Sequence, residues 1–129
     1  MKNLVVLKDD YEFLKASLPQ YKNSAAFSRE SIESLEIELE KARVVERNEF
    51  PDDVVRIDSM VMIMDISSGK EMQLRLVLPK DEDPKKKNIS VMAPVGTALI
   101  GFRKGDVVKW KVPAGEKKFR IKDVKNEVN

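Results

Sequence analysis

The sequence predicts an α+β fold: a short N-terminal antiparallel helical hairpin, followed by a mostly antiparallel sheet packed on one short helix. Two observations lead to this prediction. The first 50 residues contain no glycine and repeat apolar side chains at helical spacing. The rest of the chain holds all five glycines, and apolar and polar residues alternate there as in half-buried strands. We therefore expect a boundary near residues 48–53, between a hairpin (1–50) and a sheet domain (51–129).

Two helices are expected in the first half. Asp9 with Glu12 three residues later resembles a capping box, and Pro19 is expected to end this helix, because a proline pushes the preceding residue out of the helical region. A second helix is expected from about Ser28 to about Glu46. The apolar stripes that would bury each other are Tyr11, Leu14 and Leu18 in the first helix and Ile32, Leu35, Leu39 and Ala42 in the second.

Five strands and one helix are expected in the second half. The strands are residues 54–66, 72–78, 89–92, 106–112 and 117–124, separated by turn signals such as Ser68-Gly69. Pro94 suits the first turn of a helix, where its missing N–H would have no partner in any case. Gly101 follows the apolar run 98–100 and is expected to end that helix.

The composition excludes several kinds of chemistry. The chain has no cysteine and no histidine, which rules out thiol nucleophiles, disulfides, imidazole bases and zinc sites built on either residue. No apolar run approaches the roughly 18 residues of a membrane-spanning helix, and the apolar patch near the N-terminus is too short for a signal peptide. With 42% hydrophobic and 36% charged residues, we expect a globular cytoplasmic protein without a membrane partner.

A specific motif lies near the middle of the second half. The segment 89–106, Ile-Ser-Val-Met-Ala-Pro-Val-Gly-Thr-Ala-Leu-Ile-Gly-Phe-Arg-Lys-Gly-Asp, resembles the signature of the C-terminal domain of the GreA/GreB family of Gre factors. The likeness continues through Trp110 and the segment 113–115, and it reaches back to 53–55 and 58–61. It implies an FKBP-like fold for this part of the chain.

The resemblance also implies a partner. Gre-type proteins bind RNA polymerase at the coiled coil on the rim of its secondary channel, so we expect a transcription elongation regulator that meets DNA only through the transcription complex. The turn Met92-Ala93-Pro94 is expected to be exposed and to form part of the binding surface. We expect a monomer.

The first half predicts that this regulator does not induce transcript cleavage. Cleaving Gre factors carry acids at the tip of a long coiled coil, where carboxylates help to hold a second Mg²⁺. Here the expected connection, residues 19–27, has no acid, and the longer helix would reach only roughly 28 Å. The chain therefore resembles most the Rnk branch (regulator of nucleoside diphosphate kinase), which has a stunted hairpin. We expect no catalytic residue, no metal and no cofactor, and thus no enzyme.

A basic stripe is expected on the last two strands. If Trp110 lies opposite Phe119 on the buried face, the other face carries Lys109, Lys111, Lys118, Arg120 and Lys122. This register places Lys111 opposite Lys118 and Lys109 opposite Arg120, and like charges directly opposite destabilise a strand pair. An acidic partner would relieve that repulsion. A solvated sheet face that merely resists aggregation is the alternative interpretation.

Two other functions remain possible from the sequence. The FKBP-like fold is shared with peptidyl-prolyl isomerases, but their pockets need several aromatic side chains, and fold alone does not confer function. The basic stripe could also belong to a DNA-binding module, although no recognition-helix pattern accompanies it.

Overall fold

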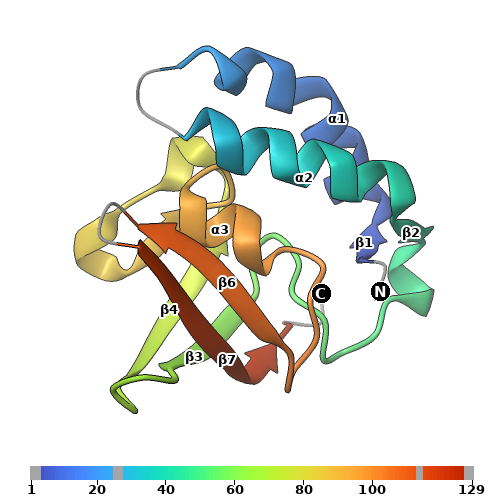
Figure 1. Cartoon of the computed structure of the whole chain (residues 1–129). Helices are drawn as coiled ribbons and strands as arrows, with labels where there is room; N and C mark the ends of the chain where they lie inside the picture. Colours follow the sequence, from blue (N-terminus) through green and yellow to red (C-terminus); the bar gives the residue numbers. More distant parts are fainter. Residues whose placement is uncertain (1–3, 25–27, 113–114, 127–129) are drawn as a thin grey trace.

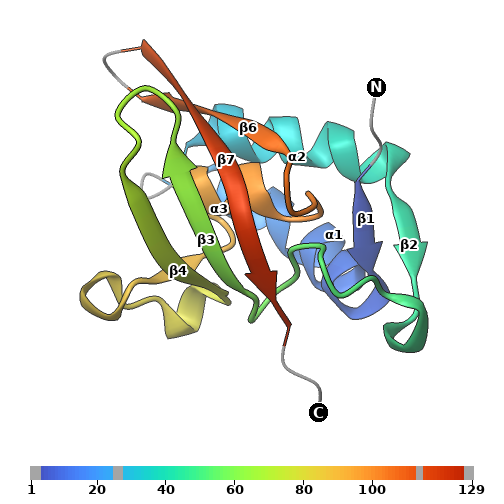
Figure 2. The same cartoon turned by 90° about the horizontal axis from the view of Figure 1, so that it is seen from below.

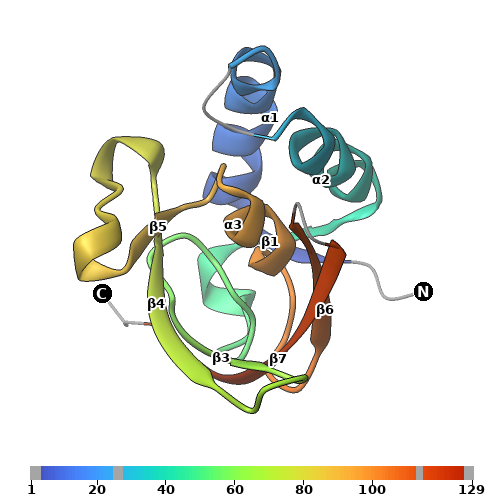
Figure 3. The ribbon, with the colours of Figure 1, turned by 60° about the vertical axis from the view of Figure 1, so that its left-hand side comes forward.

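The computed structural model describes residues 4–24, 28–112 and 115–126, with the side chains of Lys111 and Val112 also outside the description. Two helices lie side by side over one end of a curled sheet, and a third helix lies inside the curl (Figures 1 and 3). The helices are α1 (Lys8–Lys22), α2 (Arg29–Lys41) and α3 (Pro94–Leu99). The strands are β1 (Val5–Leu7), β2 (Arg43–Val45), β3 (Met60–Asp65), β4 (Glu71–Val77), β5 (Asn88–Ser90), β6 (Val107–Val112) and β7 (Gly115–Lys125). The predicted α+β arrangement is confirmed.

Helix α1 differs from the prediction at both ends. It begins at Lys8 after Leu7, which provides no side-chain cap, so the predicted capping box is wrong. It continues through Pro19 to Lys22, so the prediction that Pro19 ends the helix is also wrong. Contacts on either side of the proline explain this: Leu18 is fully buried in the core, and Lys22 forms an ion pair with Glu36 of α2 at 2.7 Å. These contacts offset the hydrogen bond that the proline lacks.

Helix α2 begins where predicted and ends earlier. The Ser28 hydroxyl caps it by accepting from the Ser31 N–H at 3.2 Å. The expected continuation to about Glu46 is wrong, because Arg43–Val45 forms strand β2, which pairs in parallel with β1. Figure 2 shows this two-stranded sheet beside α1.

The large sheet has the strand order β5-β4-β3-β7-β6, with β4 and β5 parallel and the other neighbours antiparallel. The predicted strand 54–66 is wrong in its first half. Val54 makes only an isolated bridge to Arg103, and Asp58 has a positive φ of 79° that turns the chain before β3 begins at Met60. The other four predicted strands are confirmed to within two residues at each end.

Helix α3 confirms the motif prediction. Pro94 occupies its first turn, and Gly101 follows its end with φ +83°, a conformation that glycine adopts readily. Gly96 has a separate packing role, since a Cβ placed there would overlap the Ser90 carbonyl oxygen and the Val91 backbone. This glycine lets α3 lie directly against the chain that follows β5.

The described residues of both halves contribute to one hydrophobic core. Leu14, Leu18, Ile32 and Leu39 of the hairpin belong to the same buried cluster as Ile63 and Leu99. The backbone also joins the halves, since the Val5 N–H donates to the Gly101 carbonyl at 3.3 Å. The division at residues 48–53 stays a prediction, and the first half packs closely on the second.

Candidate functional site

The turn before α3 is more buried than the sequence suggested. Met92 is 0% exposed, and its N–H donates to the Ser90 hydroxyl at 3.0 Å. The expectation that Met92 is exposed is therefore wrong, because its side chain fills the core beside α3. Ala93 and Pro94 are half-buried and reach the surface.

The basic stripe exists on the outer face of β6 and β7. Phe119 and Ile121 are buried against the core, so the alternate residues of β7 face away from α3. The described members of the stripe are all exposed: Lys109, Lys118, Arg120 and Lys122. The side chain of Lys111 lies outside the described residues.

The predicted register of this hairpin is wrong. Phe119 lies opposite Val108, Lys118 opposite Lys109, and Lys117 opposite Trp110. The aromatic contact that suggested the other register still forms diagonally, with the Trp110 and Phe119 ring centroids 5.5 Å apart. Strand β7 also begins at Gly115, whereas the predicted loop ran from Pro113 to Glu116; Pro113 and Ala114 lie outside the described residues.

The register changes the electrostatics of the stripe. Lys109 and Lys118 are the like-charged pair directly opposite each other, while Lys111 lies opposite Glu116 and Arg120 lies opposite Val107. The repulsion predicted at two positions is thus found at one. The turn at Ala93 and Pro94 and the stripe are not brought together, because α3 and the stripe lie on opposite faces of the sheet.

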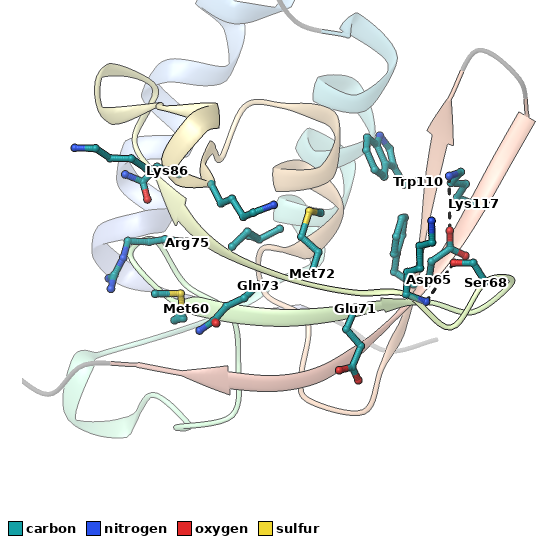
Figure 4. Close-up of a pocket in the computed structure, with 15 residues that line it drawn as sticks. Met60, Asp65, Ser68, Glu71, Met72, Gln73, Arg75, Lys86, Trp110 and Lys117 are labelled. Atoms are coloured by element: carbon teal, nitrogen blue, oxygen red, sulfur yellow. Dashed lines mark hydrogen bonds and ion pairs between the residues drawn. The ribbon is translucent and has the colours of Figure 1, made fainter.

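A second cationic surface surrounds the start of β4, where β5 does not pair with it. This cationic groove has a volume of about 760 Å³ and is lined by five basic residues, Lys70, Arg75, Lys86, Lys87 and Lys117, against two acids, Asp65 and Glu71. Figure 4 shows Met72 and Trp110 on the concave side of the sheet, whereas Glu71 and Gln73 point from the other side. The groove therefore wraps around the free edge of β4, and its floor on the concave side is apolar.

One lysine of this groove is held in place. The Lys117 ammonium lies 3.6 Å from a carboxylate oxygen of Asp65. The Ser67 hydroxyl and backbone N–H both donate to that carboxylate, and they lower the pKa of Asp65 together with Lys117. Asp65 therefore stays ionised, and one positive charge of the groove is neutralised locally.

The hairpin offers no metal site in the described part of the chain. No group of three potential acidic ligands comes together within residues 4–24, 28–112 and 115–126. Two acids lie near the start of α2: Glu33 forms an ion pair with Arg29 at 3.2 Å, and Glu30 lies in the first turn of the helix. Residues 25–27 of the predicted acid-free connection lie outside the description.

One buried polar contact joins the helical hairpin to the sheet domain and was not predicted from the sequence. Asp10 of α1 is only 7% exposed, and its carboxylate accepts from the Ile57 N–H at 2.9 Å. Burial raises the pKa of Asp10 to about 6, although the Ile57 hydrogen bond and Arg56 act in the opposite direction. An acid in the first helical turn is expected from the helix dipole, so the sequence carried no signal of its burial.

None of the helices in the described ranges combines the length and the apolar character needed to cross a membrane.

Comparison with known proteins gives a consistent result. Residues 50–126 match the family described as "Transcription elongation factor, GreA/GreB, C-term". A transcription elongation factor GreA from Clostridium botulinum (strain Eklund 17B / Type B) is 40% identical over 104 residues, which cover 81% of this chain and 65% of the relative. A GreA from Clostridium beijerinckii is 40% identical over 100 residues, covering 78% of this chain and 62% of the relative. The chain thus spans less than two thirds of these relatives.

Solved structures match over a larger share. The prokaryotic transcription elongation factor GreA/GreB from Nitrosomonas europaea covers 98% of this chain and 100% of its own, with 35% identity and a TM-score of 0.78. The GreA factor homolog 1 (Gfh1) of Thermus thermophilus covers 97% of this chain and 100% of its own, at 24% identity and a TM-score of 0.52, and this likeness concerns the fold alone.

Proposed function

The chain belongs to the GreA/GreB family of transcription elongation factors, and from this premise we propose that it binds RNA polymerase at the secondary channel and regulates elongation. The observation that carries the proposal is the match of residues 50–126, which includes the turn, α3 and both strands of the basic stripe. We assign no catalytic residue to the chain, so any chemistry in the complex belongs to the polymerase.

Docking is assigned to the second half and has two separable parts. One is the half-buried surface at Ala93 and Pro94, supported from beneath by Met92. The other is the basic stripe of Lys109, Lys111, Lys118, Arg120 and Lys122. The position of Lys109 directly opposite Lys118 supports this part, because an acidic partner surface would lower the free energy of that pair.

Binding without transcript cleavage is the second part of the proposal. Helix α2 has 13 residues, a length of roughly 20 Å, which is shorter than the sequence predicted. Cleavage needs hard oxygen ligands for Mg²⁺ at the end of a long rigid arm. Neither an acid cluster nor such an arm is found in the described part of the hairpin. The likeness to the Rnk branch stays a prediction.

A binding measurement with core RNA polymerase tests the proposal. The full-length protein should be retained by immobilised polymerase, and a cleaving GreA should displace it from the shared site. If the protein is not retained, or if saturating GreA leaves it bound, the proposed function is wrong.

A further inference from the structure

A second groove lies between α2, α3 and the outermost strand β6. Its volume is about 730 Å³. Its apolar lining includes Leu35 of α2, Ala98 of α3, Phe102 and Trp110. Figures 1 and 3 show α2 passing near β6 on the side where no further strand follows. An apolar surface therefore borders a free edge of the sheet.

The register determines which peptide groups β6 presents at this edge. The Ile121 N–H donates to the Asp106 carbonyl at 2.9 Å, which makes Val107 and Arg120 a pair without mutual hydrogen bonds. In the alternation that follows, Val108 and Trp110 bond to β7, whereas the N–H and C=O of Val107 and Lys109 point away from it. Such outward groups can pair with an added strand.

The charges around the groove restrict what can bind. Four acids line it against one basic residue, Lys109: Glu30 and Glu38 on α2, Asp106 just before β6, and Glu116 opposite Lys111. The whole chain has a net charge of +2, so this acidic lining opposes the overall charge of the protein. Asp106 and Glu116 lie at the two ends of β6, and Glu30 and Glu38 are separated by two turns of α2. Negative charge is therefore found towards both ends of an apolar groove.

We propose that this acidic groove binds an extended segment of a partner protein that has small apolar residues at its centre and lysine or arginine at its ends. The segment adds to β6 as a sixth strand of the sheet, bonding to the outward peptide groups of Val107 and Lys109. Its central side chains pack on Leu35 and Ala98, and its basic ends meet the acids. The groove shares Lys109 with the basic stripe and Pro94 with the proposed docking turn, so the two surfaces overlap. Peptide binding to the protein alone does not depend on polymerase binding.

A designed peptide tests the proposal on the full-length protein. The probe is acetyl-Lys-Lys-Val-Thr-Val-Thr-Val-Lys-Lys-amide, and its matched control has glutamate in place of every lysine. Trp110, the only tryptophan in the chain, lines both this groove and the cationic groove, so its fluorescence reports binding at either one. Substitution of Glu30 and Glu38 assigns the signal to the acidic groove. We expect the lysine peptide to bind with an affinity that falls as salt is added, and the glutamate peptide to bind at least tenfold more weakly. No binding of the lysine peptide up to about 1 mM, or equal binding of both peptides, would overturn the proposal.

Backbone pairing is tested separately from charge. Lys109→Pro removes one outward N–H without removing a bond to β7, and it also removes a positive charge that would repel the probe. Tenfold weaker binding to this variant, at unchanged melting temperature, is expected. Of two probes N-methylated on either the valines or the threonines, one should lose binding and the other keep it, because alternate N–H groups of a strand face opposite ways. Equal binding of both methylated probes would overturn strand addition.

A second variant keeps the test decisive if Lys109→Pro does not fold. Glu30→Gln with Glu38→Gln should weaken binding of the lysine peptide at least fivefold, whereas Glu12→Gln, an exposed acid of α1 outside the groove, should not. Unchanged binding to the double variant would contradict the proposal. Sedimentation without peptide tests whether a second copy of the chain occupies the groove instead. A dimer that excludes the probe would show that it does, and would overturn the proposal.

Discussion

Asp10 and Gly96 have structural roles that their residue types alone do not suggest. In the sequence, Asp10 looks like an ordinary acid in the first turn of a helix. In the structure it is buried between α1 and the chain before β3. Gly96 stands inside a helix, where glycine normally costs stability, because the backbone of Ser90 and Val91 leaves no room for a Cβ. In both cases a contact with another segment explains the residue. Asp10 contacts Ile57, which is distant in sequence, and Gly96 contacts the backbone of Ser90 and Val91, which precedes α3.

Asp10 should make stability depend on pH in an unusual direction. Its pKa is about 6 in the folded protein against 3.8 in the unfolded chain, so the folded state holds the proton more tightly. Its contribution is fully present below about pH 4 and is lost as pH rises through about 6, a change of about 3 kcal/mol. Asp10→Asn keeps an acceptor for Ile57 without the charge. The difference in unfolding free energy between the wild type and this variant should therefore shift by about that amount between about pH 4 and about pH 7 in denaturant titrations.

Asp9→Asn is the matched control for that measurement. Asp9 is exposed and lies 3.5 Å from Arg47 across the surface, so its removal should change stability by less than about 1 kcal/mol. Parallel pH profiles for the wild type and Asp10→Asn would show that burial does not perturb Asp10.

Gly96→Ala should destabilise the protein by about 3 kcal/mol, because the new methyl group must displace backbone atoms of Ser90 and Val91. Ala98→Gly, the reverse substitution in the same helix, should cost only about 1 kcal/mol. Thermal melting of both variants compares the two effects. A Gly96→Ala variant as stable as the wild type would contradict the close packing of α3.

At the level of elements, local sequence patterns predicted the helix α3, whereas the short strands and the strand register depend on pairing between segments and were not predicted. The motif at Pro94 to Gly101 located α3 because its start and end signals are local. The strands β1 and β2 have three residues each, too few to show a periodicity. They form because the segment before α1 and the segment after α2 lie side by side and pair. The register of β6 and β7 could not be predicted from the alternation of buried and exposed residues. That alternation is the same whether Trp110 and Phe119 lie directly opposite each other or in diagonal contact.

The basic stripe gives a prediction at this scale. Lys118→Glu with Arg120→Glu should weaken binding to core polymerase at least tenfold while leaving the melting temperature nearly unchanged, since both side chains are exposed. Lys15→Glu with Lys41→Glu makes the same charge change on the helices and should leave binding within about twofold, allowing for long-range screening. If the two double variants bind alike, the stripe is a solvated face and not an interface.

At the scale of the whole molecule, α1 and α2 are packed down onto the core of the sheet domain. Leu14, Leu18, Ile32 and Leu39 are buried together with residues of the sheet and α3. The fold class and the family could be predicted from the sequence, because a local motif identifies the family. The close packing of the halves could not, because it depends on side chains such as Asp10 that look exposed in a helical pattern.

The central claim is that this protein occupies the polymerase site without inducing cleavage, and a backtracked elongation complex tests it most directly. Stalled complexes are incubated with this protein, with a cleaving GreA, or with both, and the short 3′ RNA products are measured. The protein alone should leave cleavage at the intrinsic rate of the polymerase, and at saturating concentration it should suppress cleavage by GreA. Cleavage above the intrinsic rate with this protein alone, or undiminished cleavage in the mixture, would contradict the account.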